Sequence, residues 1–568
     1  MNNSILSYAL AWPFLSVLLV LFIPAGMGRL LKIVLSGSSA VLLAIIVLVV
    51  MQFDPGLPAD QTWLGYQLVE KSDWITLNLQ AFGTLSVDYL VGVDGLNLAL
   101  LALTGLVIFI ASVSSWTIEN RIKGYVLCFL LISGSIVGCF VALDFFLFFI
   151  FFEFMLLPMF FLIGLWGGQN KEYAALKFFL YTLAGSVFIL MPMIALYMSM
   201  IDPVETAIQF GLMKPGEMLT NEVIFEVQQL LASGSIPAEQ IVHTFSIPYL
   251  SDASNLIPHS ILSFESESKL WGIPMRNWGF FALVLGFLIK LPSAPLHTWL
   301  PDAHVEAPTA VSVLLAGLVL KVGAYGLLRI VLPVFPEMLV QYAFPLAAIG
   351  LFSIWYGALN ALGSPDLKKL VAYSSVSHMG FVLLGISALT AEGITGAVYQ
   401  TISHGLISPL LFILTGVIYD RVQNRNRDQL NGLVKPMPVY VALFMLAFFA
   451  AMGIPGFSGF IAEILVIIGA FKSSGFNQII PRWVAILSTG GLFLSAAYSL
   501  YTARKMFFGP LQIPEQTEIS AFKDLNIREY LMVIPLLLLI LLLGIFPSLL
   551  IEYINPVVEH LTLLVEGK

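Results

Sequence analysis

Long apolar segments, each bounded by charged or turn residues, recur along the whole chain. Fourteen of them are close to the length of about 20 residues that a helix needs to cross the hydrocarbon core of a bilayer. They lie near residues 5–25, 31–51, 91–113, 124–142, 145–166, 174–200, 277–294, 309–332, 339–361, 370–389, 395–418, 437–471, 482–503 and 530–551. The pattern predicts an all-α polytopic membrane protein with about 14 transmembrane helices.

The composition agrees with this interpretation. Of the 568 residues, 59% are hydrophobic and 11% are charged, whereas soluble domains average roughly 45–50% and about 25%. The 26 Lys and Arg against 34 Asp and Glu leave no basic surface, which argues against a nucleic-acid partner. Cys128 and Cys139 lie in one apolar run, about 16 Å apart along a helix axis. We therefore expect neither a disulfide nor a thiolate metal cluster.

The distribution of Lys and Arg among the loops predicts the orientation. One alternating set of loops holds fifteen of these residues and the opposite set holds eight. Because positively charged loops stay on the cytoplasmic side, both termini should lie outside the cytoplasm. The expected location is a bacterial inner membrane.

The longest non-membrane stretch, residues 201–272, carries nine acids and two lysines and so accounts for most of the net charge of −8. Within it, the segment LTNEVIFEVQQLLAS places apolar residues on one helical face. We expect a small extra-cytoplasmic cap with one amphipathic helix, and interpret it as an insertion rather than a ligand site. His243 and His259 in this stretch are expected to be solvated.

Two ionisable residues lie in the predicted spans of the first half. Glu153 stands inside LDFFLFFIFFEFMLLPMFFLIG, and Lys177 begins the next span in EYAALKFFLYTLAGS. A charge at the bilayer centre costs at least about 2.5–3.5 kcal/mol, so such a residue is a functional candidate by default. Lys177 could supply the cation that Glu153 needs, or it could simply extend to the cytoplasmic interface.

A third candidate lies where a span must break. Lys290 ends FFALVLGFLIK, and four prolines in the next 18 residues prevent a continuous helix. Non-helical backbone at membrane depth is tolerated when it is buried in protein or lines a wet cavity. The polar residues His297, Asp302 and His304 in this stretch therefore indicate a hydrated passage, although an ordinary cytoplasmic loop is the alternative. Lys321 follows, about 12 residues into the next span.

The second half repeats this theme with other groups. His378 and His404 stand in consecutive apolar spans, where a histidine can serve packing alone or a proton relay. The segment LAFFAAMGIPGFSGFIAEILVIIGAF breaks its helix around Gly453 and Pro455 and then carries Glu463. Interrupted helices at corresponding places of two halves are typical of internally repeated transporters. Spans 4–8 pair with spans 9–13, by position only.

These boundaries divide the chain into four parts. Residues 1–115 hold spans 1–3 with an extra-cytoplasmic loop, and residues 116–332 form the first repeat, which includes the acidic stretch 201–272. Residues 333–508 form the second, inverted repeat. Residues 509–568 form a C-terminal loop and span 14.

Three runs of sequence closely resemble one family. The runs are FFEFMLLPMFFLIGLWGG, KLPSAPLHTWLPDAHVEAPTAVSVLLAGLVLKVGAYGLLR and VAYSSVSHMGFVLLG, and they resemble the antiporter-like membrane subunits of respiratory complex I, the NADH:quinone oxidoreductase. The resemblance implies fourteen helices with two inverted five-helix repeats, spans 4–8 and 9–13, in which helices 7 and 12 are broken. It also implies a proton-translocating subunit of an oxidoreductase whose separate hydrophilic arm oxidises NADH and reduces quinone.

The resemblance implies a role for each buried ionisable residue. Glu153 and Lys177 would form the charged pair of the first half-channel, with Lys290 as the lysine of the broken helix. Lys321 would link this half-channel to a central axis that continues through His378 and His404. Glu463 would pass the proton to the far side. The candidate residues for proton translocation are therefore Glu153, Lys177, Lys290, Lys321, His378, His404 and Glu463, with His297, Asp302 and His304 as supporting polar residues at the broken helix.

Two features resemble the chain M branch of that family. Chains L and N and the Mrp-type antiporter subunits usually carry lysine where this sequence has Glu463. Chain L also adds a long lateral helix after its core, whereas this sequence stops soon after span 14. The stretch 201–272 is longer than we expect of chain M between spans 6 and 7.

The motifs and the resemblance also indicate which cofactors and partners to expect. The sequence has no phosphate-binding loop, dinucleotide fingerprint or cysteine cluster, so we expect no cofactor or metal in this chain. By resemblance, NADH, FMN, iron–sulfur clusters and quinone belong to partner subunits, and the direct partners are the antiporter-like chains L and N, smaller membrane subunits, the lipid bilayer and protons. The alternatives are an Mrp-type cation/proton antiporter, a membrane hydrogenase or ferredoxin-dependent homologue, and a purely structural anchor.

Overall fold

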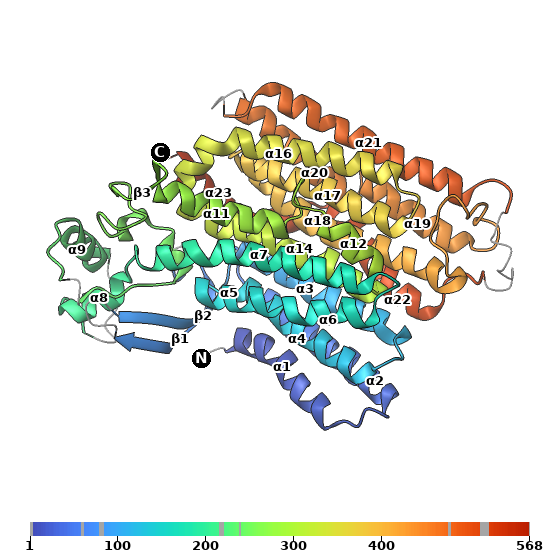
Figure 1. Cartoon of the computed structure of the whole chain (residues 1–568), viewed down its shortest axis with the longest axis horizontal. Coiled ribbons are helices and arrows are strands. Elements are labelled where there is room, and N and C mark those ends of the chain that lie inside the picture. Colours follow the sequence, from blue (N-terminus) through green and yellow to red (C-terminus); the bar gives the residue numbers. More distant parts are fainter. Residues whose placement is uncertain are drawn as a thin grey trace.

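The chain folds into a bundle of long tilted helices with a small extramembrane region at one end (Figure 1). The computed structural model describes residues 4–57, 62–78, 84–214, 221–237, 240–474, 479–511 and 522–566. The first residues of α1 and the last residues of α23 lie at the end of the bundle that also carries β1, β2, α8 and α9 (Figure 1).

The helices of the first half are α1 (Ile5–Phe22), α2 (Gly28–Gln52), α3 (Gly95–Ser114), α4 (Ile122–Val141), α5 (Phe145–Phe154), α6 (Leu156–Trp166), α7 (Lys171–Tyr197), α8 (Pro203–Phe210), α9 (Asn221–Ala232), α10 (Ile247–Leu250), α11 (Met275–Lys290), α12 (Trp299–Glu306), α13 (Thr309–Leu314), η6 (Leu315–Val319), α14 (Leu320–Gly326), η7 (Leu327–Val331) and α15 (Leu332–Val334). Those of the second half are α16 (Pro336–Gly363), α17 (Leu367–Ser387), α18 (Ala391–Val422), α19 (Pro438–Ala451), α20 (Ser458–Lys472), α21 (Arg482–Phe507), α22 (Ile527–Ile545) and α23 (Ser548–Glu566). The strands are β1 (Gln67–Asn78), β2 (Thr84–Val93), β3 (Lys269–Leu270) and β4 (Ile273–Pro274).

Among the described residues, thirteen helices are long and apolar enough to cross a membrane. Twelve of them coincide with predicted spans, and the thirteenth is α23, which the sequence analysis left in the C-terminal part. The two predicted spans that do not reach this length are the two with a predicted break. Residues 277–294 correspond to α11, and residues 437–471 are divided between α19 and α20.

Both breaks have a local cause. After Lys290, the backbone of the Leu-Pro-Ser-Ala-Pro segment leaves the helix, and its polar groups are satisfied internally, for example by the hydroxyl of Ser353, which accepts a hydrogen bond from the Ala294 amide at 2.9 Å. In the second half, Gly453 and Gly456 adopt positive φ angles of 68° and 98°, which favour glycine. A new helix, α20, then begins at Ser458.

The centre of the bundle is formed by helices that are buried on all sides. In the segment Thr309–Val334 (α13 to α15) and in helix α18, every residue of the most apolar stretch is buried, and in α17 nearly every one is. By contrast, fewer than half of the residues in the corresponding stretch of α1, α2, α21 and α22 are buried. The outer faces carry exposed apolar side chains, as lipid or partner contact requires. Polar side chains on α14, α17 and α18 therefore lie inside the protein and away from its outer faces.

The extramembrane end contains features that the all-α prediction omitted. Strands β1 and β2 pair antiparallel as a hairpin, and Glu70 of β1 accepts a hydrogen bond from the Leu6 amide of α1 at 2.8 Å. The predicted amphipathic helix is α9, whose Val227 and Leu231 are buried in a small separate core. The prediction for His243 was wrong, because this residue is buried and packs on the Tyr197 ring.

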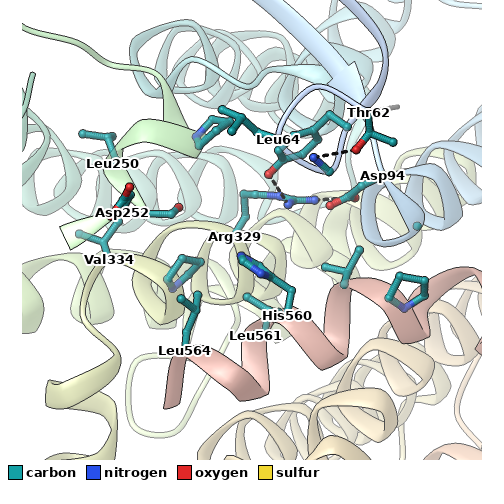
Figure 2. Close-up of a pocket in the computed structure, with 18 of the residues that line it drawn as sticks. Thr62, Leu64, Asp94, Leu250, Asp252, Arg329, Val334, His560, Leu561 and Leu564 are labelled. Carbon is teal, nitrogen blue, oxygen red and sulfur yellow. Dashed lines mark hydrogen bonds and ion pairs between the residues drawn. The ribbon is translucent and has the colours of Figure 1, made fainter. Parts of the chain in front are cut away.

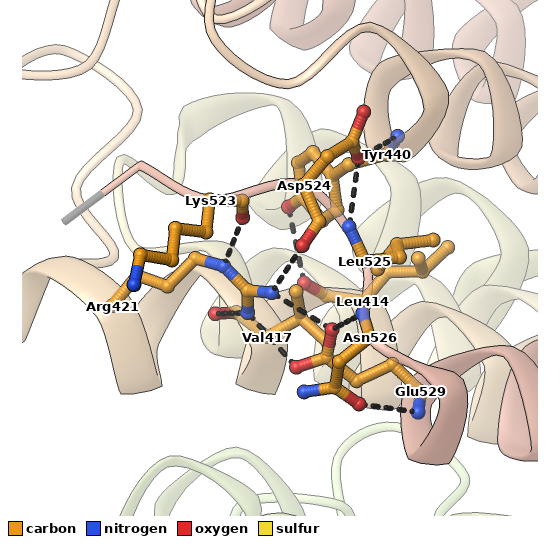
Figure 3. A network of polar contacts seen from close by, with 9 residues as sticks. All are labelled: Leu414, Val417, Arg421, Tyr440, Lys523, Asp524, Leu525, Asn526 and Glu529. Carbon is orange, nitrogen blue, oxygen red and sulfur yellow. Dashed lines mark hydrogen bonds and ion pairs between the residues drawn. The ribbon is translucent and has the colours of Figure 1, made fainter. Parts of the chain in front are cut away.

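A polar clamp closes the opposite end of the bundle (Figure 3). Arg421, near the end of α18, donates to both carboxylate oxygens of Glu529, at 2.9 and 2.7 Å, and to the carbonyl oxygens of Lys523 and Asp524. The Asp524 carboxylate accepts from the first amides of α19, including that of Tyr440 at 2.9 Å. Bidentate arginine–carboxylate contacts are strong and directional, so this clamp fixes the segment that leads into α22 against α18.

Candidate functional site

Four buried ionisable groups meet where the two halves adjoin: Lys321 comes from the first half, and His378, His404 and Glu463 come from the second. The Nζ of Lys321 lies 2.6 Å from Nδ1 of His404 and donates to the Ala316 carbonyl at 2.5 Å. The His404 and His378 rings lie 5.6 Å apart, centroid to centroid. Nδ1 of His378 lies 3.0 Å from Oε1 of Glu463. A row of titratable groups thus runs from Lys321 to Glu463, and every member of it is buried.

Four different helices position the row. Lys321 stands on α14, directly after the π-helical turn η6, and π-turns often mark functional sites. His378 and His404 come from α17 and α18, and Glu463 lies in the second turn of α20 after the break. Helices α18 and α20 approach closely because Gly396 has no side chain. A Cβ there would lie 2.6 Å from the Val466 amide nitrogen.

Gln400 extends the row, and the sequence analysis missed it. Its Nε2 lies 3.1 Å from Nδ1 of His378. A protonated Nδ1 can donate to Glu463, whereas an unprotonated Nδ1 can accept from Gln400. Both protonation states of His378 therefore have a partner. The available signal was a polar residue one helical turn before His404 in an apolar span.

Several atoms of the row have no hydrogen-bond partner among the described residues. They are Oε2 of Glu463, Nε2 of His404 and Oε1 of Gln400. Buried polar groups are usually satisfied, and an ordered water molecule is the common partner when no protein group is near. Water at these three atoms would join the members of the row that do not touch directly.

The first half is arranged differently. Nζ of Lys290 is buried, has no hydrogen-bond partner among the described residues, and lies 4.6 Å from the centroid of the Phe152 ring. The neighbouring Glu153 carboxyl interacts electrostatically with the Lys290 ammonium and also with the Ser186 hydroxyl. Lys290 and Glu153 are thus electrostatic neighbours, as expected of a lysine at the end of a broken helix.

The predicted pairing of Glu153 with Lys177 is wrong for this structure. Lys177 forms an ion pair with Asp302 at 2.7 Å. Ser186, which stands beside Glu153, is nine residues further along α7, or roughly 13 Å along the helix axis. Lys177 is therefore too near the end of α7 to reach Glu153, and its partial exposure is typical of an interfacial lysine.

The polar stretch after Lys290 is partly helical. Asp302 and His304 lie on the short helix α12, which was expected to be non-helical, and Pro301 fits because it stands in the first turn. His297 packs edge-on against the Tyr356 ring at 4.9 Å. His304 stacks on Phe412 at 4.5 Å and is fully buried.

Lys368 is a second residue that the sequence analysis missed. It was counted among the loop lysines, but its side chain is buried at the start of α17 and donates to the Ala307 carbonyl at 2.6 Å. The His304 ring interacts electrostatically with both Lys368 and Lys321. The sequence offered no signal, because Lys368 and Lys369 are adjacent and only one of them is buried.

The family model described as "NADH:quinone oxidoreductase/Mrp antiporter, TM" matches residues 142–232 and 244–489. The matched residues include the whole buried row. The chain belongs to this family. Most of the acidic stretch 201–272 also lies within the match.

Relatives in this family align over nearly the whole chain. The chain is 37% identical to NADH-quinone oxidoreductase subunit M of Rhodobacter capsulatus over 561 residues, covering 96% of this chain and 95% of the relative. It is 33% identical to subunit M of Rickettsia felis, with 98% of both chains covered. The predicted resemblance to the chain M branch of the complex I family is therefore confirmed.

Two solved structures have the same fold. A chain of respiratory complex I from Thermus thermophilus superposes with a TM-score of 0.76 and 26% identity, covering 99% of both chains. A chain of the Mrp complex from Dietzia superposes with a TM-score of 0.74 and 20% identity, covering 99% of this chain and 97% of the other. The antiporter-like fold predicted from the sequence is thus confirmed, and the Mrp match bears on fold alone.

Metal-ligating side chains do not gather in the part of the chain that the structure describes. No group of three or more His, Cys, Asp or Glu residues there could hold a metal ion. The chemistry available at the row is proton exchange among lysine, histidine and carboxylate groups.

Proposed function

We propose that this chain is a proton-translocating membrane subunit of a respiratory NADH:quinone oxidoreductase. The observation that carries the proposal is the buried row from Lys321 through His404 and His378 to Glu463, in a chain related over its whole length to subunit M. NADH, FMN, iron–sulfur clusters and quinone would reside in partner subunits. Those partners are the antiporter-like chains L and N, smaller membrane subunits and, through them, the hydrophilic arm.

In the proposed mechanism, a proton reaches Lys321 and moves to His404, across to His378 and then to Glu463. The contact of 2.6 Å between Lys321 and His404 permits direct transfer, and the step between the two histidine rings requires a bridging water. The groups are coupled, so their protonation changes together rather than independently. Energy for the cycle comes from redox chemistry outside this chain.

Lys290 and Glu153 control the entry in this proposal. A cation on Lys290 is held by the nearby carboxylate of Glu153 and the face of Phe152. When Glu153 becomes neutral, the positive charge of Lys290 is no longer balanced, and its proton is displaced toward Lys321. The Lys177–Asp302 ion pair lies aside from this step and would orient α12 against α7.

The domain division and orientation belong to the same proposal. Residues 116–332 and 333–508 would act as two inverted repeats, with 1–115 and 509–568 supporting them. The end with the hairpin and the termini would face away from the cytoplasm of a bacterial inner membrane, since the opposite end carries the larger share of basic loops.

The test is native purification in a mild detergent, followed by mass spectrometry, an NADH:quinone reductase assay and proton uptake in liposomes. The expected result is a complex that contains this chain and iron–sulfur subunits and that pumps protons when NADH is added. Isolation with small membrane subunits only, together with sodium-dependent proton exchange and no redox activity, would contradict the proposal and favour an Mrp-type antiporter.

A further inference from the structure

A cavity of about 860 Å³ opens at the end of the bundle that carries the termini (Figure 2). Its walls come from the loop before β1, from β1 itself, the end of the buried segment Thr309–Val334, and helix α23. In Figure 2, Arg329 points toward Asp94, and His560 of α23 lines a neighbouring wall. The cavity therefore brings space for water to a buried ion pair inside the bundle.

The ion pair lies on the same helical segment as the lysine of the buried row. Arg329 stands eight residues after Lys321, or roughly 12 Å along the axis. Tyr325 lies between them, one turn from each. A cavity at Arg329 is therefore separated from Lys321 by about two helical turns. If protons could cross these turns, the outer side would be connected to Lys321, and every proton held there could leak.

The hydrogen bonds at Arg329 all point away from the guanidinium. Arg329 donates to Asp94 at 2.6 Å, to the Tyr66 hydroxyl at 2.7 Å and to the Tyr325 hydroxyl at 3.2 Å. An arginine has five donors and no acceptor, and it stays protonated in proteins. A proton cannot hop through such a group, because each member of a hopping chain must accept one proton and release another.

The partners of Arg329 are equally fixed. The Tyr325 hydroxyl donates to the Phe140 carbonyl at 3.3 Å, and a backbone carbonyl cannot pass a proton onward. Oδ1 of Asp94 also accepts from the Leu96 and Asn97 amides at 3.0 Å each, as the cap of α3. With the Arg329 guanidinium, three donors therefore meet on this one oxygen and hold the carboxylate in place.

We propose that Arg329, held by Asp94, Tyr66 and Tyr325, is a proton plug that insulates Lys321 from the water in this cavity. The inference rests on the proposed function, since it assigns a task to residues outside the conducting row. Arg329 is a positioning residue and takes no part in transfer. With the plug in place, a proton on Lys321 can leave only along the row toward His404.

The test measures passive proton leak, without NADH, in liposomes that contain the intact purified complex. A potassium diffusion potential drives protons inward, and a pH-sensitive dye records their entry. Arg329→Gln replaces the guanidinium with an amide that both donates and accepts. We expect its leak to exceed that of the wild type by about tenfold or more, because the barrier of a fixed arginine is lost.

Two controls separate the plug from general loosening. Arg329→Lys keeps a protonated donor and should leak no more than about twice the wild type. Arg421→Gln removes an arginine–carboxylate pair of similar burial at the opposite end of the bundle and should not leak. If Arg329→Gln fails to assemble, the double variant Arg329→Gln with Asp94→Asn keeps the pair neutral and hydrogen-bonded, and the same leak is expected.

An assembled Arg329→Gln or double variant with wild-type leak would overturn the proposal. Equal leak in Arg421→Gln would overturn it too, since the effect would then be one of packing. Failure of the proposed function gives a different result. The wild-type complex would show no NADH-driven pumping, whereas the leak comparison does not depend on NADH.

Discussion

The two halves of the bundle hold their buried charges in opposite ways. The second half supplies His404, His378 and Glu463, which continue from Lys321 at the end of the first half as a nearly continuous row with direct contacts of 2.6 and 3.0 Å. In the first half, Lys290 has no hydrogen-bond partner among the described residues and is stabilised by an aromatic face and a neighbouring carboxylate. The halves share a broken helix, but they do not share a way of satisfying a buried charge.

The difference separates two tasks. A row of groups within hydrogen-bond distance can pass a proton with little rearrangement. An isolated ammonium responds instead to the charge of its neighbour, because unscreened Coulomb interactions act over several ångströms in a dry interior. The row that the second half forms with Lys321 is therefore suited to conduction, and the surroundings of Lys290 are suited to electrostatic control.

The largest effect is expected for breaking the row at its first member. Lys321→Met removes the proton donor to His404 and should lower the rate of proton pumping roughly a hundredfold, the typical contribution of a positioned acid or base. Proton uptake by liposomes with the purified complex measures it. Lys369→Met is the matched control, since that lysine is exposed. Pumping above about a tenth of the wild-type rate would contradict a conducting role for Lys321.

The stability of the two lysine variants sharpens the comparison. Lys290→Met removes an ammonium that satisfies no acceptor, whereas Lys321→Met leaves Nδ1 of His404 and the Ala316 carbonyl without their donor. Each unpaired buried acceptor costs about 1–3 kcal/mol. Lys290→Met should therefore unfold at a higher temperature than Lys321→Met in detergent. The reverse order, or equal midpoints, would show that the lysines are held alike.

A smaller effect is expected at the corrected ion pair. A double-mutant cycle of Lys177→Met with Asp302→Asn should give a coupling of about 0.2–1 kcal/mol, because both groups are partly exposed. The same cycle of Lys177→Met with Glu153→Gln should give none. Thermal unfolding in detergent provides the free energies. Coupling only in the second cycle would restore the pair that the sequence suggested.

A pH-dependent effect is expected at the residues that begin corresponding helices. Asp366 caps α17 and forms an ion pair with Arg425 at 2.5 Å. Asp144 caps α5, is buried, and forms no ion pair with any residue that the structure describes. Burial raises the pKa of Asp144 from 3.8 to about 7. The native state therefore prefers the protonated form, and its stability declines as pH rises from about 4 to about 7.

Replacing this cap removes the titration. Between pH 5 and pH 8 the unfolding temperature of Asp144→Asn should fall less than that of the wild type, since an amide caps the helix but does not ionise. Asp252→Asn, at an exposed position, is the control. Parallel curves for wild type and Asp144→Asn would show that Asp144 is charged throughout this range.

Much of the fold follows from apolar run lengths and prolines alone. The breaks after Lys290 and around Gly453 were predicted, because proline and glycine act locally. The hairpin β1–β2 and helix α23 were missed. In β1 charged residues interrupt the apolar ones, and β2 runs directly into the predicted span near residues 91–113. Helix α23 carries acids and a proline that mask its apolar face.

The site was predicted as a set of residues and only partly as a set of contacts. An ionisable residue inside a long apolar segment is easily recognised in the sequence. Lys321, His404 and Glu463 were predicted in this way. Which charges meet depends on how helices are offset along their axes, and the sequence does not contain this. The offset decided the error at Lys177 and concealed Gln400, whose role appears only beside His378.

The most direct test of the account is whether Glu463 changes its protonation during turnover. Infrared difference spectra of the purified complex, recorded with and without NADH, report carboxyl groups that gain or lose a proton. We expect a carboxyl band in the wild type that is absent in Glu463→Gln and retained in Glu392→Gln, a variant at a partly exposed carboxylate outside the row. Identical difference spectra for wild type and Glu463→Gln, from complexes that both pump protons, would contradict the conducting row.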